Sequence, residues 1–210
     1  MSPRPVFELQ RPGELMVVIG PPAVGKMTVG RAICAASDFR LFHNHHVIEP
    51  LADVFGFGSP AFAALKDDLR IRVIEAAAEH GVRLVLTFVW PVDEPADADT
   101  VRSYLAPYVD RGLRVTFVEL YAGLETRLVR NVQPDRVAAK PTKADLVWSD
   151  AHVREADATQ RLNTDPDDPT TPADAVLRDF AHLRLDNTDL TPEQVAEQVL
   201  AWRATLDDGN

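Results

Sequence analysis

The sequence predicts a three-layer α/β/α sandwich around a mostly parallel sheet of five strands. Short apolar runs alternate about five times with segments whose apolar residues recur at helical spacing. This alternation is typical of a parallel sheet covered by helices on both faces. The 210 residues, of which 46% are hydrophobic, suit one globular unit with a sizeable core. We therefore expect a single domain over residues 1–210.

The first two expected strands flank a loop and a helix. The run at 14–20, ELMVVIG, is largely apolar and ends in glycine, as a strand buried on both faces does. Apolar residues then recur at helical spacing over 24–37, and 39–43 can form the second strand. A longer helical pattern over 60–80 stops at Gly81, a usual signal for a helix C-terminus.

Two more strands and two more helices are expected in the middle of the chain. Residues 83–90 are rich in branched and aromatic side chains, which favour a strand. A helix over 98–112, interrupted or bent at Pro107, leads into a fourth strand at 113–121 and a helix at 124–131.

The C-terminal part supplies the last strand and the closing helix. A Pro- and Asp-rich loop at 164–172 precedes a short strand at 182–187. Thr191 is the expected N-cap of the final helix, with Pro192 at its first position. Because ligands in such folds bind beyond the carboxyl ends of the strands, we expect the turns after the five strands to surround one crevice.

The composition excludes or disfavours several classes of protein. The net charge of −10 argues against a general nucleic-acid binder, which would carry a basic surface. No apolar run approaches the roughly 18 residues of a membrane span, and the first residues lack the apolar core of a signal peptide. We therefore expect a cytoplasmic monomer or homodimer. Cys34 is the only cysteine, which excludes an internal disulfide and a cysteine-based metal site.

The stretch GPPAVGKMT follows the first strand and opens the first helix. Two glycines leave room for backbone N–H groups to wrap phosphate oxygens, and the helix N-terminus points at the same anion. The lysine would reach the β- and γ-phosphates. Met27 stands where the usual pattern has Ser or Thr. The expected nucleotide-binding residues are Gly20, Pro21, Pro22, Ala23, Val24, Gly25, Lys26, Met27 and Thr28.

Positive charge gathers in the stretch 127–143. It holds five cations against one acid, Asp135: Arg127, Arg130, Arg136, Lys140 and Lys143. A local excess of about four positive charges inside an acidic protein fits a site that handles an anion, and it also fits a solvated charged face.

The stretch GPPAVGKMT resembles the phosphate loop of the adenylate-kinase-like P-loop kinases, where the lysine is followed by a non-hydroxyl residue and then threonine. The resemblance implies ATP and Mg²⁺ as cofactors, with the Thr28 hydroxyl near the metal. Met27 is bulkier than the usual glycine, which leaves the metal geometry open. The rest of the chain loosely resembles the superfamily of small-molecule and nucleoside monophosphate kinases, including the shikimate and gluconate kinases.

The segment ETRLVRNVQPDR (125–136) resembles the helix-and-lid element of those kinases, where one arginine stacks on adenine and later ones clamp the transferring phosphate. This implies a helical lid at about 127–150. Arg127 would face adenine, Arg130 and Arg136 would bind the phosphate, and Lys140 and Lys143 are extra cations at the substrate. Asn187, in RLDNT, lies in a stretch similar to the loop that touches adenine.

Three motifs together, GPPAVGKMTVG, LFHNH and KPTK…W.S, resemble a bacterial group within this superfamily. Its members are labelled as AAA-family ATPases or as shikimate-kinase-like proteins. This likeness implies nucleotide binding and leaves the substrate open.

Three of the six histidines, His43, His45 and His46, follow the second strand in LFHNHHVIEPL. In shikimate-like kinases this turn presents acids, whereas imidazoles could accept a hydroxyl proton, bind an anionic group or hold a metal. The alternatives are a structural histidine cluster, a zinc site and, by its letters, an HNH nuclease. We expect His43 to be catalytic, and His43 and His45 to contact the substrate.

Asp93, in FVWPVDEP after the third strand, is the other candidate base, although a solvent-facing acidic loop is equally compatible with this stretch. Together these features predict an ATP-dependent kinase that transfers a phosphoryl group to a small hydroxyl- or phosphate-bearing acceptor. A nucleotide-binding regulator or slow NTPase without an acceptor is the alternative. A polynucleotide-end kinase is disfavoured by the net charge of −10.

Overall fold

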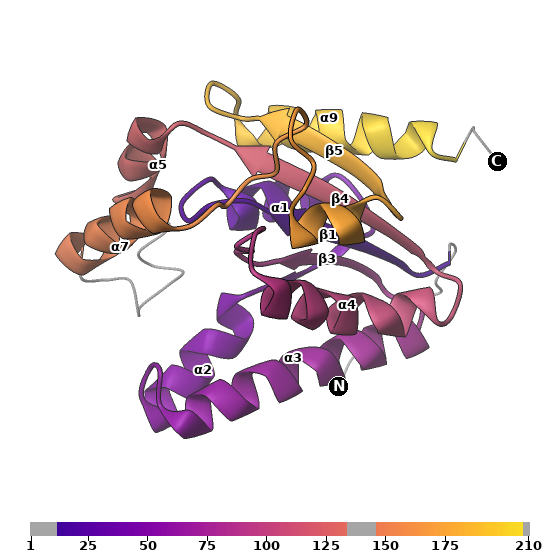
Figure 1. Ribbon diagram of the computed structural model, residues 1–210. Coiled ribbons are helices and arrows are strands. Elements are labelled where there is room, and N and C mark those ends of the chain that lie inside the picture. Colours follow the sequence, from indigo (N-terminus) through magenta and orange to yellow (C-terminus); the bar gives the residue numbers. More distant parts are fainter. Residues whose placement is uncertain (1–11, 134–145, 208–210) are drawn as a thin grey trace, which may run out of the picture.

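The central feature of the computed structural model, which describes residues 12–133 and 146–207, is a five-stranded sheet (Figure 1). The strands lie in the order β2-β3-β1-β4-β5, and every neighbouring pair is parallel. They are β1 (Glu14–Ile19), β2 (Arg40–His43), β3 (Arg83–Thr87), β4 (Arg114–Tyr121) and β5 (Ala181–Asp186). The predicted α/β fold is confirmed.

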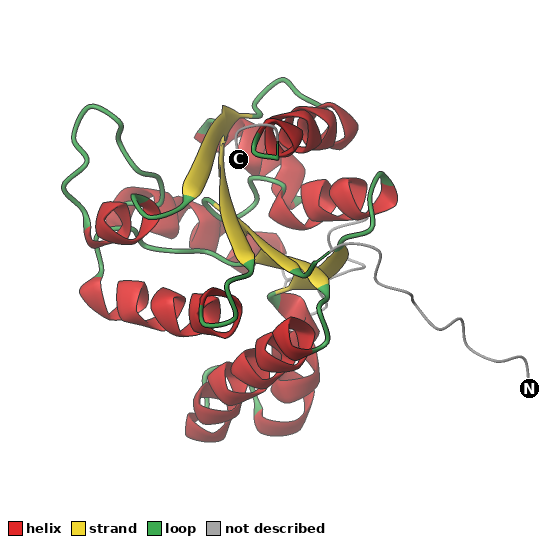
Figure 2. Ribbon diagram, turned by 90° about the vertical axis from the view of Figure 1, so that its right-hand side faces the viewer, coloured by secondary structure: helices red, strands yellow, loops and turns green. Residues whose placement is uncertain are grey.

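Helices cover both faces of this sheet (Figures 1 and 2). They are α1 (Lys26–Ala35), α2 (His45–Phe55), α3 (Pro60–Glu79), α4 (Pro95–Val109), α5 (Leu124–Asn131), α7 (Leu146–Thr159), α8 (Pro172–Leu177) and α9 (Pro192–Thr205). One face carries α1 and α9, and the other carries α3, α4 and α8. Helices α2, α5 and α7 lie at the carboxyl ends of the strands. In the described part of the chain, no helix is long and apolar enough to cross a bilayer.

Successive residues of β1 serve the two faces in turn. Met16 and Val18 pack in the cluster under α1 and α9, whereas Leu15 and Val17 pack in the cluster under α3, α4 and α8. This follows from the period of two in a strand. Because both faces are buried, the strand reads as a continuous apolar run, which is why it could be predicted from sequence.

Three helices were not predicted, and one of them changes the interpretation of the histidines. Residues 45–55 form α2 and not a turn, with Asn44 as N-cap and Val47 and Ile48 buried. Pro50 inside this helix weakens its helical signal in the sequence. The other two unpredicted helices are α7 and α8. Helix α7 begins at Leu146, where the described residues resume, and α8 begins at the end of the Pro- and Asp-rich loop.

The largest differences from the predicted boundaries are three residues, and they occur in β3 and α4. Strand β3 ends at Thr87 and not at Trp90, because β1 and β2 pair with it only as far as Val18 and His43. The next three residues leave the sheet at its carboxyl edge. Helix α4 starts three residues earlier than expected, at Pro95, because proline is favoured in the first turn of a helix.

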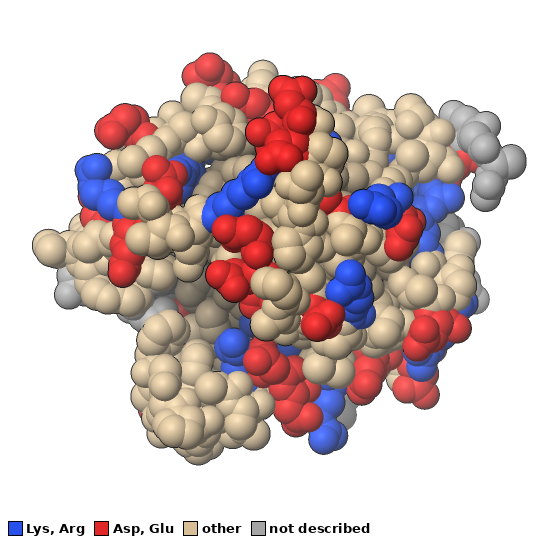
Figure 3. Space-filling model, in the orientation of Figure 1, with Lys and Arg blue, Asp and Glu red and all other residues tan. Residues whose placement is uncertain are grey.

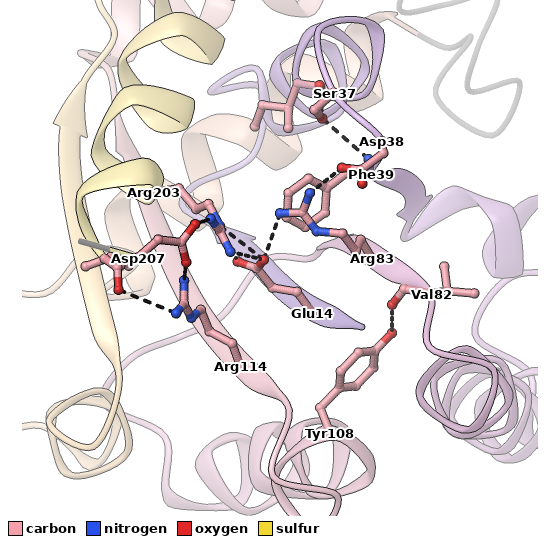
Figure 4. Close-up of polar contacts among 12 residues, drawn as sticks. Glu14, Ser37, Asp38, Phe39, Val82, Arg83, Tyr108, Arg114, Arg203 and Asp207 are labelled. Atoms are coloured by element: carbon pink, nitrogen blue, oxygen red, sulfur yellow. Dashed lines mark hydrogen bonds and ion pairs between the residues drawn. The ribbon is translucent and has the colours of Figure 1, made fainter. Parts of the chain in front are cut away.

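A network of charged side chains closes the amino edge of the sheet (Figure 4). Glu14 at the start of β1 is 2% exposed. It accepts hydrogen bonds from Arg83 Nη2 at 2.8 Å and Arg203 Nη2 at 2.9 Å. Asp38 pairs with Arg83, and Asp207 pairs with both Arg114 and Arg203. These contacts tie α9 to β1, β3 and β4.

Candidate functional site

The loop between β1 and α1 has a backbone that only glycine can adopt without strain at two positions. Gly20 has φ +132°, and a Cβ there would lie 2.4 Å from the carbonyl oxygen of Leu120. Gly25 has φ +110° and is the N-cap of α1. A Cβ on Gly25 would meet one atom within 4 Å, Nδ2 of Asn187 at 3.5 Å. The loop therefore brings the N-terminus of α1 to an open concavity.

The three residues that follow differ in how they face this concavity. The Lys26 ammonium donates hydrogen bonds to the carbonyl oxygens of Gly20 at 2.6 Å and Pro21 at 2.7 Å. Met27 is 7% exposed and Thr28 is exposed, and both line the cleft. The hydroxyl at position 28 is therefore accessible, and Met27 is mainly a packing residue.

A cleft of about 1070 Å³ opens at the carboxyl ends of the strands. Its lining includes seven residues of the loop and early α1: Pro22, Ala23, Gly25, Lys26, Met27, Thr28 and Val29. Gly20, Pro21 and Val24 are buried beneath them. The space-filling view shows a recess between the tip of α2 and α3 and the lobe of α5 and α7 (Figure 3).

Arg130 and Asn187 fasten the loop to the segment after β5. Arg130 donates to the carbonyl oxygens of Val24 at 3.1 Å, Asn187 at 2.7 Å and Thr188 at 3.1 Å. Asn187 Nδ2 donates to the same Val24 oxygen at 2.9 Å. Burial lowers the pKa of Arg130, an effect that nearby Asp186 and Asp189 oppose. Arg130 and Asn187 line one end of the cleft together with Leu190 and Pro192.

Arg127 does not take the position expected for an adenine-facing arginine. Its side chain is 3% exposed, its Nε donates to the Ala122 carbonyl oxygen at 3.0 Å, and its Nη2 pairs with Asp157 of α7. The guanidinium is thus directed into the contact between α5 and α7, away from the cleft lining. Arg136, Lys140 and Lys143, with the centre of the predicted lid, lie outside the described residues.

The histidines after β2 form a compact group. His43 is 6% exposed, and its ring centroid lies 3.7 Å from that of His46. His45 Nδ1 lies 2.6 Å from Glu49 Oε1, and both His43 and His45 line the cleft. Burial lowers the pKa of His46, and the positive charge of Arg31 lowers it further. Among the described residues, no three His, Cys, Asp or Glu side chains are grouped as metal ligands, which leaves the zinc alternative unsupported there.

Asp93, the other expected base, is exposed and lies outside the lining of the cleft. The segment before it is fixed by hydrogen bonds from Val92 N to the Arg161 carbonyl oxygen and from Ala173 N to the Val92 carbonyl oxygen. Thr87, Phe88 and Val89 line the cleft in its place. Of the described residues in the lining, the single carboxylate is Asp53 of α2.

A smaller compartment of about 280 Å³ lies between α2, α3 and α4. Asn44, Ile48, Phe57, Phe88 and Val89 line both this compartment and the main cleft. At its polar side, Arg70 donates to the Tyr104 hydroxyl at 2.7 Å and to Asp67 Oδ1 at 3.2 Å, and it pairs with the side chain of Asn44.

Several lining residues were not identified from sequence. Arg70 and Tyr104 belong to different helices and meet only in the folded chain. Trp148 and His152 of α7 stack with ring centroids 5.4 Å apart, and both line the main cleft. Their spacing of four residues is that of neighbours on a helix face, which is the one signal that could have paired them.

Comparisons with known proteins find relatives at the level of fold. No family model matches the chain. Shikimate kinase of Rhodococcus jostii is 36% identical over 66 residues, a match that covers 29% of this chain and 39% of that enzyme. The chain therefore matches well under two thirds of that relative's length.

Solved structures match over nearly the whole chain. A candidate kinase of Chloroflexus aurantiacus has a TM-score of 0.61 at 18% identity, covering 96% of this chain and 100% of that one. APS kinase of Mycobacterium tuberculosis, in complex with AMPPNP and APS, has a TM-score of 0.57 at 17% identity, covering 92% and 98%. Shikimate kinase of Acinetobacter baumannii, in complex with shikimate, has a TM-score of 0.54 at 16% identity, covering 93% and 94%. The chain therefore shares the fold of these kinases.

Proposed function

We propose that the protein is an ATP-dependent phosphotransferase acting on a small acceptor. The observation that carries this proposal is the loop at 20–28. Its glycine backbone, the N-terminus of α1 and the Lys26 ammonium meet at a cleft of about 1070 Å³. A concavity of backbone N–H groups with a lysine beside it is suited to phosphate. A second compartment adjoins the cleft, since several residues line both, and it offers room for an acceptor.

The nucleotide base would occupy the end of the cleft lined by Arg130, Asn187 and Pro192. The planar face of an arginine can stack on a base. The Oδ1 atom of Asn187 is buried and has no hydrogen-bond partner in the described part of the chain, so it could accept a hydrogen bond from an amino group of the base. We therefore assign the base-facing role to Arg130, in place of Arg127.

Magnesium fits the exposed hydroxyl of Thr28, because oxygen is the ligand that this ion prefers. When bound, Mg²⁺ would supply neutralisation of phosphate charge. The chain itself would supply binding and orientation: backbone N–H groups and Lys26 on the phosphates, and His43 as the group positioned to accept a hydroxyl proton. His43 is favoured over Asp93 because it lines the cleft.

The compartment between α2, α3 and α4 favours this proposal over a regulator or slow NTPase without an acceptor, for which no such pocket is needed. The relatives described as kinases of shikimate and APS support a phosphotransferase of some kind. A cytoplasmic location, a single domain and a monomeric or homodimeric state stay predictions.

The test is nucleotide binding by calorimetry, followed by acceptor-dependent release of ADP. Lys26→Ala should weaken ATP binding about 30- to 1,000-fold, the range for one charge-assisted phosphate contact worth about 2–4 kcal/mol. Arg72→Ala, which removes an exposed cation on α3, is the control and should leave the affinity unchanged. Equal ATP affinities for the folded Lys26→Ala variant and the native protein would remove the proposal.

A further inference from the structure

Aromatic side chains form part of the wall of the compartment between α2, α3 and α4, beside charged and aliphatic ones. Phe57, Phe62, Phe88 and Trp90 line it, and the rings of Phe57 and Phe62 lie 5.2 Å apart. The stretch 54–65, which forms the tip of α2 and α3, contains no charged residue. Figure 3 shows that tip as an uncharged lobe below the recess. An apolar ring entering here would replace water on ring surfaces.

The charges that line the same compartment balance one another. There are two cations, Lys66 and Arg70, and two carboxylates, Asp67 and Asp97. Lys66 Nζ lies 3.4 Å from Asp67, and the guanidinium of Arg70, itself 5% exposed, is held by Asp67, Tyr104 and Asn44. Burial raises the pKa of the Asp97 carboxyl, and the positive charge of Lys66 opposes this rise. A carboxylate or phosphate brought into this space would gain no uncompensated cation and would lose its hydration.

One polar group on the wall still has hydrogen-bonding capacity. Trp90 is 1% exposed, and its indole Nε1 has no hydrogen-bond partner among residues 12–133 and 146–207. A buried donor without a partner costs free energy, and a neutral oxygen of a ligand would satisfy it. The indole N–H is a donor only, so it is suited to a hydroxyl, ether or carbonyl oxygen.

From these three observations we infer that the phosphoryl acceptor is an uncharged alcohol carrying a ring, bound in the aromatic compartment. The compartment selects it over carboxylate and phosphate acceptors. A volume of about 280 Å³ holds one substituted ring, since a cavity of about 150 Å³ already accepts benzene. The inference deepens the proposed function and rests on it, because only a phosphotransferase has an acceptor. Binding to the compartment can be measured without catalysis.

The reaction would convert ATP and the alcohol into ADP, a phosphate monoester and a proton. The hydroxyl oxygen forms the new bond to the terminal phosphorus as the bond from that phosphorus to the bridging oxygen of ADP breaks. The hydroxyl proton passes to a base, for which His43 is positioned at the adjoining floor of the main cleft.

The test uses pairs of probes that share a ring and differ in charge: methyl shikimate against shikimate, and methyl 4-(hydroxymethyl)benzoate against 4-(hydroxymethyl)benzoate. Their binding to the full chain is measured by calorimetry without nucleotide, and ATP binding is measured separately. We expect saturable binding of an uncharged member at least tenfold tighter than binding of its charged partner. Charged members that bind as tightly or more tightly, or uncharged members that all fail to bind, would overturn the inference.

The separate ATP measurement distinguishes the two proposals. If ATP binds and only the charged probes bind, the kinase proposal stands and the inference on the acceptor falls. If the uncharged probes bind and ATP does not, the aromatic compartment is a ligand site as inferred and the phosphotransferase proposal falls.

Three variants test the site further, and each is measured with the uncharged probe that binds to the native protein. Phe57→Ala should weaken its binding about 5- to 20-fold, because a ring contact is lost. Phe55→Ala, an exposed ring two residues away that lines neither space, should leave binding unchanged. Trp90→Phe keeps the ring and removes the donor, so a loss of about 3- to 10-fold is expected.

The decisive variant is Asp67→Asn, which should leave Arg70 with uncompensated charge while keeping the shape of the side chain. The preference between the members of a pair should then move about tenfold toward the charged one. An unchanged preference in this folded variant would contradict the role given to charge balance.

Discussion

Cationic side chains at the two edges of the sheet have different kinds of partner. At the amino edge, the guanidinium of Arg83 meets the carboxylates of Glu14 and Asp38, so that charge is matched by charge (Figure 4). At the carboxyl edge, Lys26 and Arg130 lie against backbone carbonyl oxygens of the loop at 20–25. A carbonyl oxygen orients a cation without cancelling its charge, so the cation can still attract an anion.

This difference separates stability from function within one sheet. The amino edge joins α9 to β1 and β3 through the buried carboxylate of Glu14, and changes there should act on the free energy of unfolding. At the carboxyl edge Lys26 and Arg130 have backbone oxygens as partners, and changes at these two residues should act mainly on ligand affinity.

The largest expected effect is on the amino edge. Glu14→Gln removes the buried charge that Arg83 and Arg203 share and should lower the free energy of unfolding by about 3–5 kcal/mol. ATP affinity of the folded variant should not change. Chemical denaturation and calorimetry measure the two quantities. The control is Asp68→Asn, which breaks an exposed pair with Arg72 and should cost at most about 1 kcal/mol; equal losses in the two variants would contradict the comparison.

The next effect belongs to the carboxyl edge, where Gly20→Ala should act on binding and stability together. The new Cβ would meet the Leu120 carbonyl oxygen at 2.4 Å in a backbone with φ +132°. Strain of this kind costs on the order of 1–3 kcal/mol, and the loop must shift, so ATP binding should be lost. Gly112→Ala has a positive φ but open space around the Cβ, and it should cost less and spare binding. Native ATP affinity in Gly20→Ala would show that the loop does not shape the site.

Local sequence was sufficient for the loop at 20–28, because its glycines, lysine and helix start are contiguous and the conformation follows from them. It was also sufficient for the five strands, of which the three central ones are buried on both faces. It was insufficient for the aromatic compartment, where Arg70 meets Asn44 and Tyr104 across 26 and 34 residues of chain. No periodicity in one segment reports such a contact.

The positions of the two arginines of α5 could not be predicted from local sequence either. Arg127 and Arg130 are three residues apart, and either could face the nucleotide in an isolated helix. In the structure Arg127 pairs with Asp157 of α7 and is absent from the cleft lining, whereas Arg130 is part of that lining. Asp93 was predicted to be a base because it follows a strand. The chain leaves the sheet at Thr87, however, and residues 87–89 line the cleft whereas Asp93 does not.

A moderate effect should separate those two arginines. Arg130→Ala should weaken ATP binding about 3- to 30-fold, the range for a cation stacked on an aromatic ring, with a small loss of stability. Arg127→Ala should lower the free energy of unfolding and leave the ATP affinity of the folded protein near native, because its partners are Asp157 and the Ala122 carbonyl oxygen. Isothermal titration and thermal unfolding of both variants decide the assignment. The reverse pattern would restore Arg127 to the nucleotide.

The smallest expected effect concerns Glu119, a buried carboxylate in the carboxyl half of β4. It has side-chain partners, in contrast to the backbone oxygens that contact Lys26 and Arg130. Burial alone would raise its pKa, but contacts with His182, Thr164 and Asn163 lower it below the ordinary value of 4.5. A lowered pKa means that the folded state favours the carboxylate. The stabilisation is therefore complete above pH 4.5 and is lost as the pH falls through the lower pKa of the folded state. Glu119→Gln should abolish this part of the acid dependence and reduce the Tm at pH 7 by about 2–4 °C for each kcal/mol lost. Thermal unfolding between pH 3 and 7 measures it, and parallel curves for the variant and the native protein would assign the acid sensitivity to other carboxylates, such as those of the amino edge.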